Sequence, residues 1–167
     1  MVSSFILLAG AILAGVSAAL SSDNSTWVQS KTAPSGNWFS VASSSSGSLL
    51  VAASSVKGPN VSGIYLSKDR GVTWTNPFIS GCGVDEQWNS VAISADGYSV
   101  YAVQQNFGLF YSTNQGSYWT RTIIDPTLYN ANYNSVSCSS TGAVVAATLM
   151  GGCIYVSNDF GRSFTPA

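Results

Sequence analysis

One eight-residue motif recurs at a fixed spacing along the chain. It reads SKDRGVTW at 67–74, STNQGSYW at 112–119 and SNDFGRSF at 157–164. The aromatic residues that close the three copies are 45 residues apart, and a constant period of about 20–50 residues is typical of repeat architectures. The three copies therefore occupy equivalent places in a repeated structural unit.

The residue types of the motif are those of a tight turn. The Asp or Asn at its third position can accept hydrogen bonds from backbone N–H groups, and the Gly at its fifth position adopts a positive φ without a steric penalty. The closing aromatic then enters a strand and buries a large apolar surface. The motif predicts a structural staple between two strands. The residues to which we assign this role are Ser67, Asp69, Gly71, Trp74, Ser112, Asn114, Gly116, Trp119, Ser157, Asp159, Gly161 and Phe164.

Each motif ends a longer unit in which residues alternate with the period of two that is typical of strands. The unit opens with an aromatic and a Ser-Val pair, at 38–42, 88–92 and 133–137. A Gly turn precedes a short apolar strand, at 49–53, 99–103 and 143–148. A third strand leads into the motif, at 63–65, 109–111 and 153–155, and the closing aromatic begins a fourth. Four short strands in about 45 residues are the pattern of a β-propeller blade.

The motifs resemble the Asp-box (BNR) repeat, S-x-D-x-G-x-T-W, which the first copy matches at all its fixed positions. The other copies depart from it at Asn114, Tyr118, Ser163 and Phe164. The resemblance covers residues 38–167 and implies a propeller in which the motif lies on the blade rim, away from any active site. Such repeats occur in sialidases, sortilin-type receptors, xyloglucan-acting glycosidases and photosystem II assembly factors. The resemblance therefore indicates a fold and is nearly silent on activity.

We expect an all-β chain, a partial β-propeller of about three four-stranded blades at approximately 38–80, 88–124 and 133–167, in a propeller region of 19–167. Propellers close with about four to eight blades. Three blades leave open blade edges and apolar faces, which favour self-association. Three explanations remain open: a truncated gene product, an open stack capped by its N-terminal segment, or half of a ring closed by a second copy.

The N-terminal residues form an apolar run, FILLAGAILAGVSAAL at 5–20. The run is shorter than the about 20 residues of a membrane span, so no stable span is expected. Its end fits the small-x-small rule for cleavage after Ala18, which predicts a signal peptide at 1–18 and a secreted, extracellular protein. In the alternative, residues 5–20 are strands of a degenerate blade that continues into 21–27, and the protein is intracellular.

Charged residues make up 8% of the chain, compared with about 25% in typical soluble domains. The net charge is −1 and no basic run is present, which argues against nucleic acid as a partner. The absence of histidine removes the usual triad base and the commonest metal ligand, so no cofactor or metal is expected. Cys82, Cys138 and Cys153 lack the spacing of a zinc or redox site, and at most one disulfide, of open pairing, is expected.

The longer loops lie at the end of each blade opposite the motifs, and binding residues concentrate on such loops. Aromatic side chains beside amides would suit a sugar there. The candidate binding residues are Asp85, Glu86, Trp88, Asn106, Tyr129, Asn130 and Asn132. In the alternative interpretation, Trp88 packs between blades and the other residues are solvated loop.

The residues available do not support catalysis. A glycosidase needs two carboxylates facing each other across about 5–10 Å, and the pair Asp85-Glu86 has only Asp125 as a further acid on these loops. Sialidase chemistry, as the resemblance implies, uses an arginine cluster, whereas only Arg121 lies outside the motifs.

We therefore expect a non-catalytic, secreted propeller that acts as a binding or interaction module for a carbohydrate or a protein. The alternatives are a remnant of a sialidase- or xyloglucanase-like glycoside hydrolase and a photosystem II assembly factor-like protein. Asn24 and Asn60 begin sequences that fit the N-glycosylation acceptor pattern, which would suit a secreted protein.

Overall fold

The regular structure of this protein is built from β-strands. The computed structural model describes residues 28–54, 63–77, 79, 87–125 and 131–167. The strands in these ranges are β1 (Trp38–Ser43), β2 (Leu50–Ser54), β3 (Gly63–Ser67), β4 (Trp88–Ile93), β5 (Val100–Gln104), β6 (Gly108–Ser112), β7 (Thr120–Thr122), β8 (Tyr133–Cys138), β9 (Val145–Leu149), β10 (Ile154–Ser157) and β11 (Thr165–Pro166). The expected strands are present within about two residues of their expected positions, except the fourth strand of the first unit.

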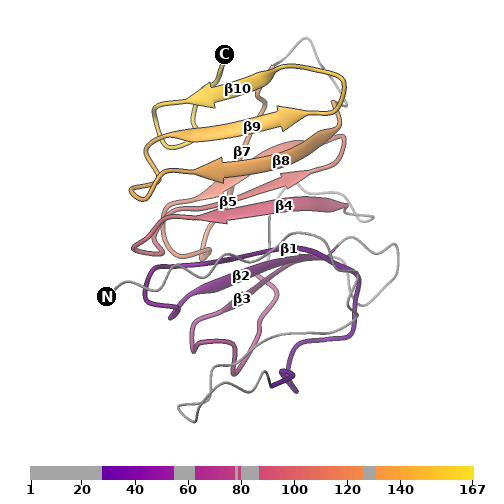
Figure 1. The fold of residues 1–167 in the computed structure, drawn as a ribbon, viewed down its shortest axis with the longest axis vertical. Helices are drawn as coiled ribbons and strands as arrows, with labels where there is room; N and C mark the ends of the chain where they lie inside the picture. Colours follow the sequence, from indigo (N-terminus) through magenta and orange to yellow (C-terminus); the bar gives the residue numbers. More distant parts are fainter. Residues whose placement is uncertain (1–27, 55–62, 78, 80–86, 126–130) are drawn as a thin grey trace.

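The strands form three antiparallel sheets that lie one above another (Figure 1). Their strand orders are β1-β2-β3, β4-β5-β6-β7 and β8-β9-β10-β11. In the first sheet, a single antiparallel bridge between Leu66 and Thr75 stands at the place of a fourth strand. None of the sheets closes on itself. The prediction of an all-β, partial and open propeller is therefore confirmed, and we call the three sheets blades 1, 2 and 3.

The strand register repeats in the same way in all three blades. The pairing of the first two strands shifts between Trp38 and Ser40, and it shifts at the equivalent places in the other blades. Opposite the valine of each Ser-Val pair lies an alanine: the pairs are Val41–Ala52, Val91–Ala102 and Val136–Ala147. An aromatic then lies opposite each alanine on the third strand, at Tyr65, Phe110 and Tyr155. The sequence repeat is thus also a repeat of backbone geometry.

Two apolar cores fill the spaces between the blades. Strand alternation in β5 sends Val100 and Ala102 into the core against blade 1, and it sends Tyr101 and Val103 into the core against blade 3. All four side chains are fully buried. Burial of a valine-sized or aromatic side chain stabilises a fold by about 1.5–3 kcal/mol. Blade 2 is therefore covered on both faces, by blade 1 on one side and by blade 3 on the other.

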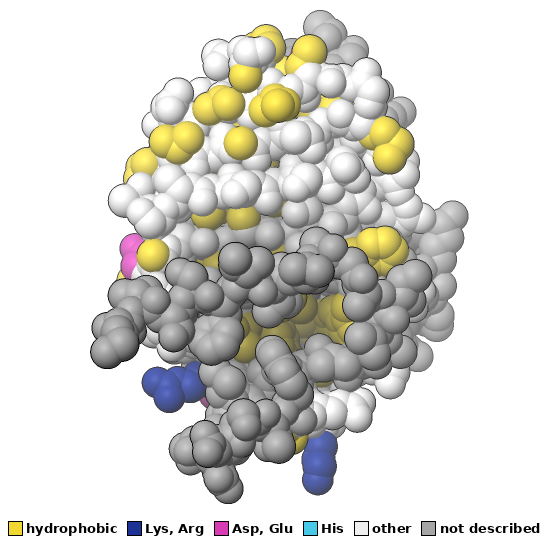
Figure 2. Space-filling view, viewed as in Figure 1, with side chains coloured by type: hydrophobic (Ala, Val, Ile, Leu, Met, Phe, Trp, Pro, Cys, Tyr) yellow, Lys and Arg dark blue, Asp and Glu magenta, His cyan; other side chains and the backbone are white. Residues whose placement is uncertain are grey.

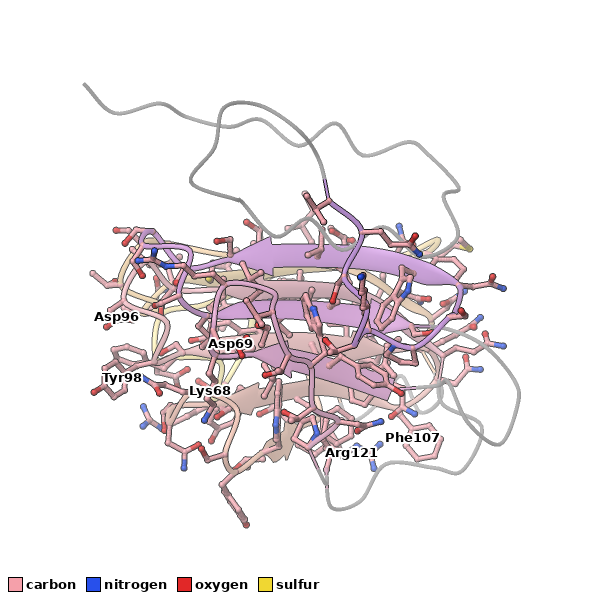
Figure 3. All side chains as sticks on the ribbon, turned by 90° about the horizontal axis from the view of Figure 1, so that it is seen from below. Lys68, Asp69, Asp96, Tyr98, Phe107 and Arg121 are labelled. Atoms are coloured by element: carbon pink, nitrogen blue, oxygen red, sulfur yellow. The ribbon has the colours of Figure 1, made fainter. Side chains whose placement is uncertain are left out.

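The two ends of the blades differ in what they carry (Figure 3). Lys68, Asp69, Asp96 and Tyr98 lie at one end, and Phe107 with Arg121 lies at the opposite end. The first end holds the three motifs and the turns between the first and second strands, and we call it the motif end. The second end holds the connections after β5 and β7, and we call it the loop end. Binding residues were expected at the loop end.

Some expectations are corrected or lie outside the described residues. The closing aromatics Trp119 and Phe164 precede β7 and β11 by one residue and do not begin them. Trp119 instead completes the turn: its indole Nε1 donates to the carbonyl oxygen of Gly116 at 3.0 Å. The predicted signal peptide and the degenerate copy lie in 1–27, outside the described ranges. Those ranges contain no helix with the length and apolarity that a membrane crossing requires.

The cysteines that the structure describes are free thiols. Cys138 is half-buried, and burial raises its thiol pKa to about 11. Cys153 is exposed. Cys82 lies outside the described residues, so the expectation of at most one disulfide stays a prediction for that residue.

Candidate functional site

The first motif folds into a turn that is held by two side chains. The Ser67 hydroxyl donates to Asp69 Oδ1 at 2.8 Å, and Ser67 Oγ accepts from the backbone N–H of Gly71 at 2.7 Å. Asp69 then accepts from Thr73 through both of its oxygens, at 2.8 Å from the backbone N–H and 2.5 Å from the hydroxyl. Gly71 has a φ of 87°, in the region that favours glycine. The turn is therefore fixed by its own sequence.

The second and third motifs repeat these contacts. Ser112 and Ser157 accept from the N–H groups of Gly116 and Gly161, both at 2.9 Å. Asn114 Oδ1 accepts from the Tyr118 N–H at 2.9 Å, so an amide oxygen replaces the carboxylate without loss of the turn. In the third copy, hydrogen bonds from the Ser163 and Ser157 hydroxyls hold the pKa of Asp159 well below its ordinary value. The acidic residues of the motifs serve the turn.

A second repeated turn joins the first two strands of each blade, and the sequence analysis found only its glycine. The hydroxyls of Ser44, Ser94 and Ser139 accept from backbone N–H groups five residues later, at 3.1, 3.0 and 3.2 Å. A serine that precedes the turn glycine by three residues in all three repeats was the available signal. This turn lies at the motif end, and its serine hydroxyls are used within the turn itself.

At the loop end, Arg121 folds over Phe107. The guanidinium lies 5.2 Å from the centre of the phenyl ring, and its Nε donates to the backbone carbonyl of Phe107 at 2.8 Å. Nη2 donates to the same carbonyl oxygen. A guanidinium has five N–H donors, so these two bonds leave three donors. Because Arg121 is exposed and Phe107 is 38% exposed, the pair presents a fixed cation beside an apolar surface.

Two further contacts join the connections at the loop end. The backbone N–H of Met150 donates to the carbonyl of Asn132 at 2.9 Å, and the Asn132 amide lies 3.5 Å from the Met150 sulfur. The Tyr155 hydroxyl donates to Asp125 Oδ2 at 3.0 Å. Burial first and the Asp125 carboxylate second raise the pKa of Tyr155. Tyr155 is therefore a protonated hydrogen-bond donor and is poorly suited to act as a nucleophile.

The predicted binding residues divide into three groups. Asn106 is exposed at the turn between β5 and β6, and Asn132 is half-buried at the start of β8, so both lie at the loop end as expected. Trp88 is fully buried and its ring packs 5.1 Å from that of Phe110, edge to face. The expectation that Trp88 contacts a ligand is therefore corrected, because its side chain belongs to the core between blades 1 and 2. Four candidates lie outside the described residues: Asp85, Glu86, Tyr129 and Asn130. The acceptor residues Asn24 and Asn60 also lie outside them.

The structure adds loop-end residues that the sequence analysis did not select as binding residues. Phe107, Ile123 and Met150 expose large apolar side chains there, at 38%, 46% and 67%. A large apolar residue within a polar loop was the signal that could have found them. Ser54 and Gln104 occupy equivalent positions at this end of their strands, and each buries a side-chain oxygen that has no hydrogen-bond partner among the described residues. Within those residues no three His, Cys, Asp or Glu side chains gather as a metal site requires.

Comparison with known proteins supports the fold. No family model matches the sequence, and no curated protein matches it. Among solved structures, YCF48 bound to a D1 peptide aligns with 83% of this chain at 17% identity, with a TM-score of 0.66. YCF48 from Cyanidioschyzon merolae aligns with 77% at 17% identity, with a TM-score of 0.59. The GH74 xyloglucanase from Xanthomonas campestris aligns with 86% at 24% identity, with a TM-score of 0.61.

The chain spans less than half the length of each of these structures. It covers 42% and 36% of the two YCF48 chains and 20% of the xyloglucanase. At these identities the similarity concerns the backbone, and proteins with one backbone fold carry unrelated activities. This chain is thus similar to part of a propeller in both groups of proteins.

Proposed function

We propose that this protein is a non-catalytic Asp-box repeat module that binds a peptide at its loop end. The contacts of Ser, Asp or Asn, and Gly in the three motifs support the Asp-box interpretation, since each residue type of the pattern has a use in the turn. The observation that carries the binding proposal is the Arg121–Phe107 pair. It offers a fixed guanidinium beside the exposed Phe107 ring, at the end of the blades where the loops are longest.

This arrangement suits a peptide better than a sugar. A guanidinium with free N–H donors binds carboxylates and backbone carbonyls, and charge-assisted hydrogen bonds of this kind are about twice as strong as neutral ones. The Phe107 ring provides an apolar contact beside it, and Ile123 and Met150 expose further apolar side chains at the same end of the blades. The similarity to YCF48, which has been solved with a D1 peptide, makes that peptide the first ligand to test.

The carboxylates support a non-catalytic role. Asp69 and Asp159 are held in their motifs, and Asp96 accepts from the Ser94 hydroxyl at 2.5 Å in the turn of blade 2. Asp125 accepts from Tyr155. Each described carboxylate therefore has a structural hydrogen bond, whereas a glycosidase needs two carboxylates that face each other across about 5–10 Å.

The test is binding of a D1 peptide, measured by isothermal titration calorimetry with the wild type and Arg121→Gln. We expect Arg121→Gln to weaken binding about tenfold, the value of one charge-assisted contact of about 1.4 kcal/mol. Arg162→Gln is the matched control, because Arg162 also covers a phenyl ring, that of Phe160, and donates to a backbone carbonyl, but at the motif end. Equal weakening by both substitutions, or no binding by the wild type, contradicts the proposal.

A glycoside hydrolase segment is the second candidate. The alignment of 86% of this chain with a GH74 xyloglucanase favours it. It predicts release of reducing sugars from xyloglucan, with a rate that falls in Asp125→Asn. Secretion is part of the first proposal, and it predicts that N-terminal sequencing of the mature protein begins at Ala19.

A further inference from the structure

Strand β7 is the outermost strand of blade 2, and one of its edges has no neighbouring strand. In blade 1, Thr75 exchanges two backbone hydrogen bonds with Leu66, each of 2.8 Å. Thr120 stands at the same place of the repeat and pairs with Tyr111 of β6. Because the backbone groups of successive residues in a strand point to opposite sides, the N–H and C=O of Arg121 point away from β6. Among the described residues neither group has a hydrogen-bond partner. We call this side of β7 the free edge.

The equivalent edges of the other two blades lack this pair of groups. In blade 3, Pro166 stands at the place of Arg121, and a proline has no backbone N–H to offer. In blade 1, the residue after that place is Pro77, and a single bridge stands where a fourth strand would lie. Proline commonly protects an edge strand from pairing with another chain. Within the described part of the chain, β7 is therefore the fourth strand whose edge offers both a donor and an acceptor.

The side chains along β7 and the residues after it alternate between two faces of the sheet. Thr122 and Ile124 are 8% and 5% exposed, and they face blade 3: Ile124 belongs to the core there, and the Thr122 hydroxyl donates to the carbonyl of Gly161 at 2.8 Å. Arg121 is exposed and Ile123 is 46% exposed. Beside its free edge, β7 thus presents a cation and an aliphatic side chain two residues apart.

The Arg121 side chain is held away from the free edge. Charged side chains often prevent strand addition by remaining at an edge. Here the guanidinium donates through Nε and Nη2 to the carbonyl of Phe107 and lies over its ring, as the two labelled side chains in Figure 3 show. Phe107 directly precedes β6, on the side of β7 opposite the free edge. The backbone groups of Arg121 therefore stay open to a further strand, and three of its N–H donors stay open to an acid.

The surroundings of this cation are sparsely charged. Charged side chains are few on the face drawn in Figure 2, as expected from their 8% share of the chain. A single guanidinium in such surroundings selects an acidic side chain, because charge-assisted hydrogen bonds are about twice as strong as neutral ones.

We propose that the free edge of β7 adds an extended peptide as a further antiparallel strand, with an acidic residue of the peptide opposite Arg121. This inference rests on the proposed peptide binding at the loop end. The acidic residue exchanges backbone hydrogen bonds with Arg121 and extends its carboxylate on the same face as the guanidinium. Two positions earlier in an antiparallel peptide, an apolar residue lies opposite Ile123. The partner is therefore a segment with the order apolar, any residue, acidic, bound by strand addition.

The first test uses the peptide STVTETS, acetylated and amidated at its ends, with the wild-type 167-residue chain in an NMR titration. N-methylation of the glutamate removes the donor that faces β7 and should weaken binding at least about tenfold. N-methylation of either threonine beside it alters an amide that points away from β7, and it should weaken binding less than about threefold. The reversed peptide STETVTS has the same composition and should bind at least about threefold more weakly. No binding of STVTETS, or equal effects of the three methyl groups, overturns the proposal.

The second test removes the backbone donor of Arg121. Arg121→Pro and Arg121→Ala both lose the side chain, but only the proline variant also loses the N–H. We expect Arg121→Pro to bind STVTETS at least about fivefold more weakly than Arg121→Ala. The fold should tolerate this proline because Pro166 occupies the equivalent place in β11, and circular dichroism checks it. Equal binding by the two folded variants overturns strand addition, and if Arg121→Pro does not fold, the methylated peptides decide with the wild type.

These outcomes separate this inference from the proposed function. Binding of the D1 peptide that falls in Arg121→Gln but is indifferent to which amide of the peptide is methylated retains peptide binding at the loop end and overturns strand addition. Absence of binding by both peptides overturns both, and it leaves Arg121 as a charge that protects the edge of β7, as Pro166 protects that of β11.

Discussion

The backbone N–H of Val91 donates to Ser40 Oγ at 3.1 Å, across 51 residues of sequence and from one blade to the next. Ser90 and Val136 repeat the contact at 3.3 Å between the following blades. In both contacts a backbone N–H of one sheet donates to a serine hydroxyl of the neighbouring sheet. A hydrogen bond of this kind fixes the relative position of two sheets, which apolar packing alone specifies less tightly.

Ser90→Ala should lower the free energy of unfolding by about 1–3 kcal/mol, because it leaves the N–H of Val136, a residue that is 5% exposed, without its partner. Ser135→Ala is the control at the equivalent, exposed position of blade 3. It should change stability by less than about 0.5 kcal/mol, because Ser135 is exposed. Urea denaturation measures both. Equal losses would mean that the serine hydroxyl does not join the blades.

Ser112→Ala should also lower the free energy of unfolding by about 1–3 kcal/mol. Ser112 is 1% exposed and its hydroxyl accepts from the N–H of Gly116, so the substitution removes the partner of a buried backbone donor. Ser117→Ala in the same motif is the control, because Ser117 is exposed and its hydroxyl receives, among the described residues, only a 3.5 Å contact from Lys68. A loss in Ser117→Ala as large as that in Ser112→Ala would contradict the described turn.

Gly116→Ala should destabilise the protein more than Gly47→Ala. The two glycines have similar positive φ values, 73° and 69°, so the conformational penalty of about 1–2 kcal/mol is common to both. A Cβ at Gly116 would lie 2.3 Å from Leu66 Cδ1 of blade 1, whereas a Cβ at Gly47 would meet nothing within 4 Å. Overpacking adds about 1–3 kcal/mol at Gly116. Thermal melting compares the two variants, and equal melting temperatures would show that the second motif does not pack on blade 1.

Stability should fall in acid because the motif carboxylates lose their hydrogen bonds. Hydrogen bonds from Ser163 and Ser157 lower the folded-state pKa of Asp159 below its ordinary 3.8, and those from Thr73 lower that of Asp69. A lowered folded-state pKa contributes stability that is fully present above the unfolded value. The contribution is lost as the pH falls through the folded value.

Asp159→Asn should reduce the loss of stability in acid. It should change stability less at neutral pH, because the amide oxygen of Asn114 already accepts the equivalent hydrogen bond in the second motif. The measurement is the melting temperature between about pH 6 and pH 2 for the wild type and the variant. Parallel curves for the two proteins would mean that the Asp159 carboxylate contributes no acid-sensitive stability.

The repeat made much of the fold predictable from the sequence. The positions of Ser67, Gly71 and their equivalents predicted the turns, since those contacts lie within eight residues and need no distant partner. The strands followed from alternation between the turns. The serines Ser44, Ser94 and Ser139 were missed, although they recur with the same period, because their hydrogen bonds cross the turn to a residue that carries no side-chain signal.

The candidate site was less predictable. Trp88 was proposed as a binding residue because it borders a loop, but the shift in register after it turns its ring into the core against Phe110. Arg121 and Phe107 are 14 residues apart and meet because β6 and β7 pair side by side. Their pairing follows from strand register, which no short pattern in the sequence encodes.

The sequence by itself determined the turns, the strand order within a blade and the period of the repeat, because these depend on hydrogen bonds and alternation among near neighbours. Tertiary structure decided which of several equivalent side chains are buried. Val41, Val91 and Val136 occupy one position of the repeat, yet the first is half exposed and the other two are buried. The difference is the presence of a preceding blade, since the burial of an apolar side chain depends on what is packed against it and not on its place in the repeat.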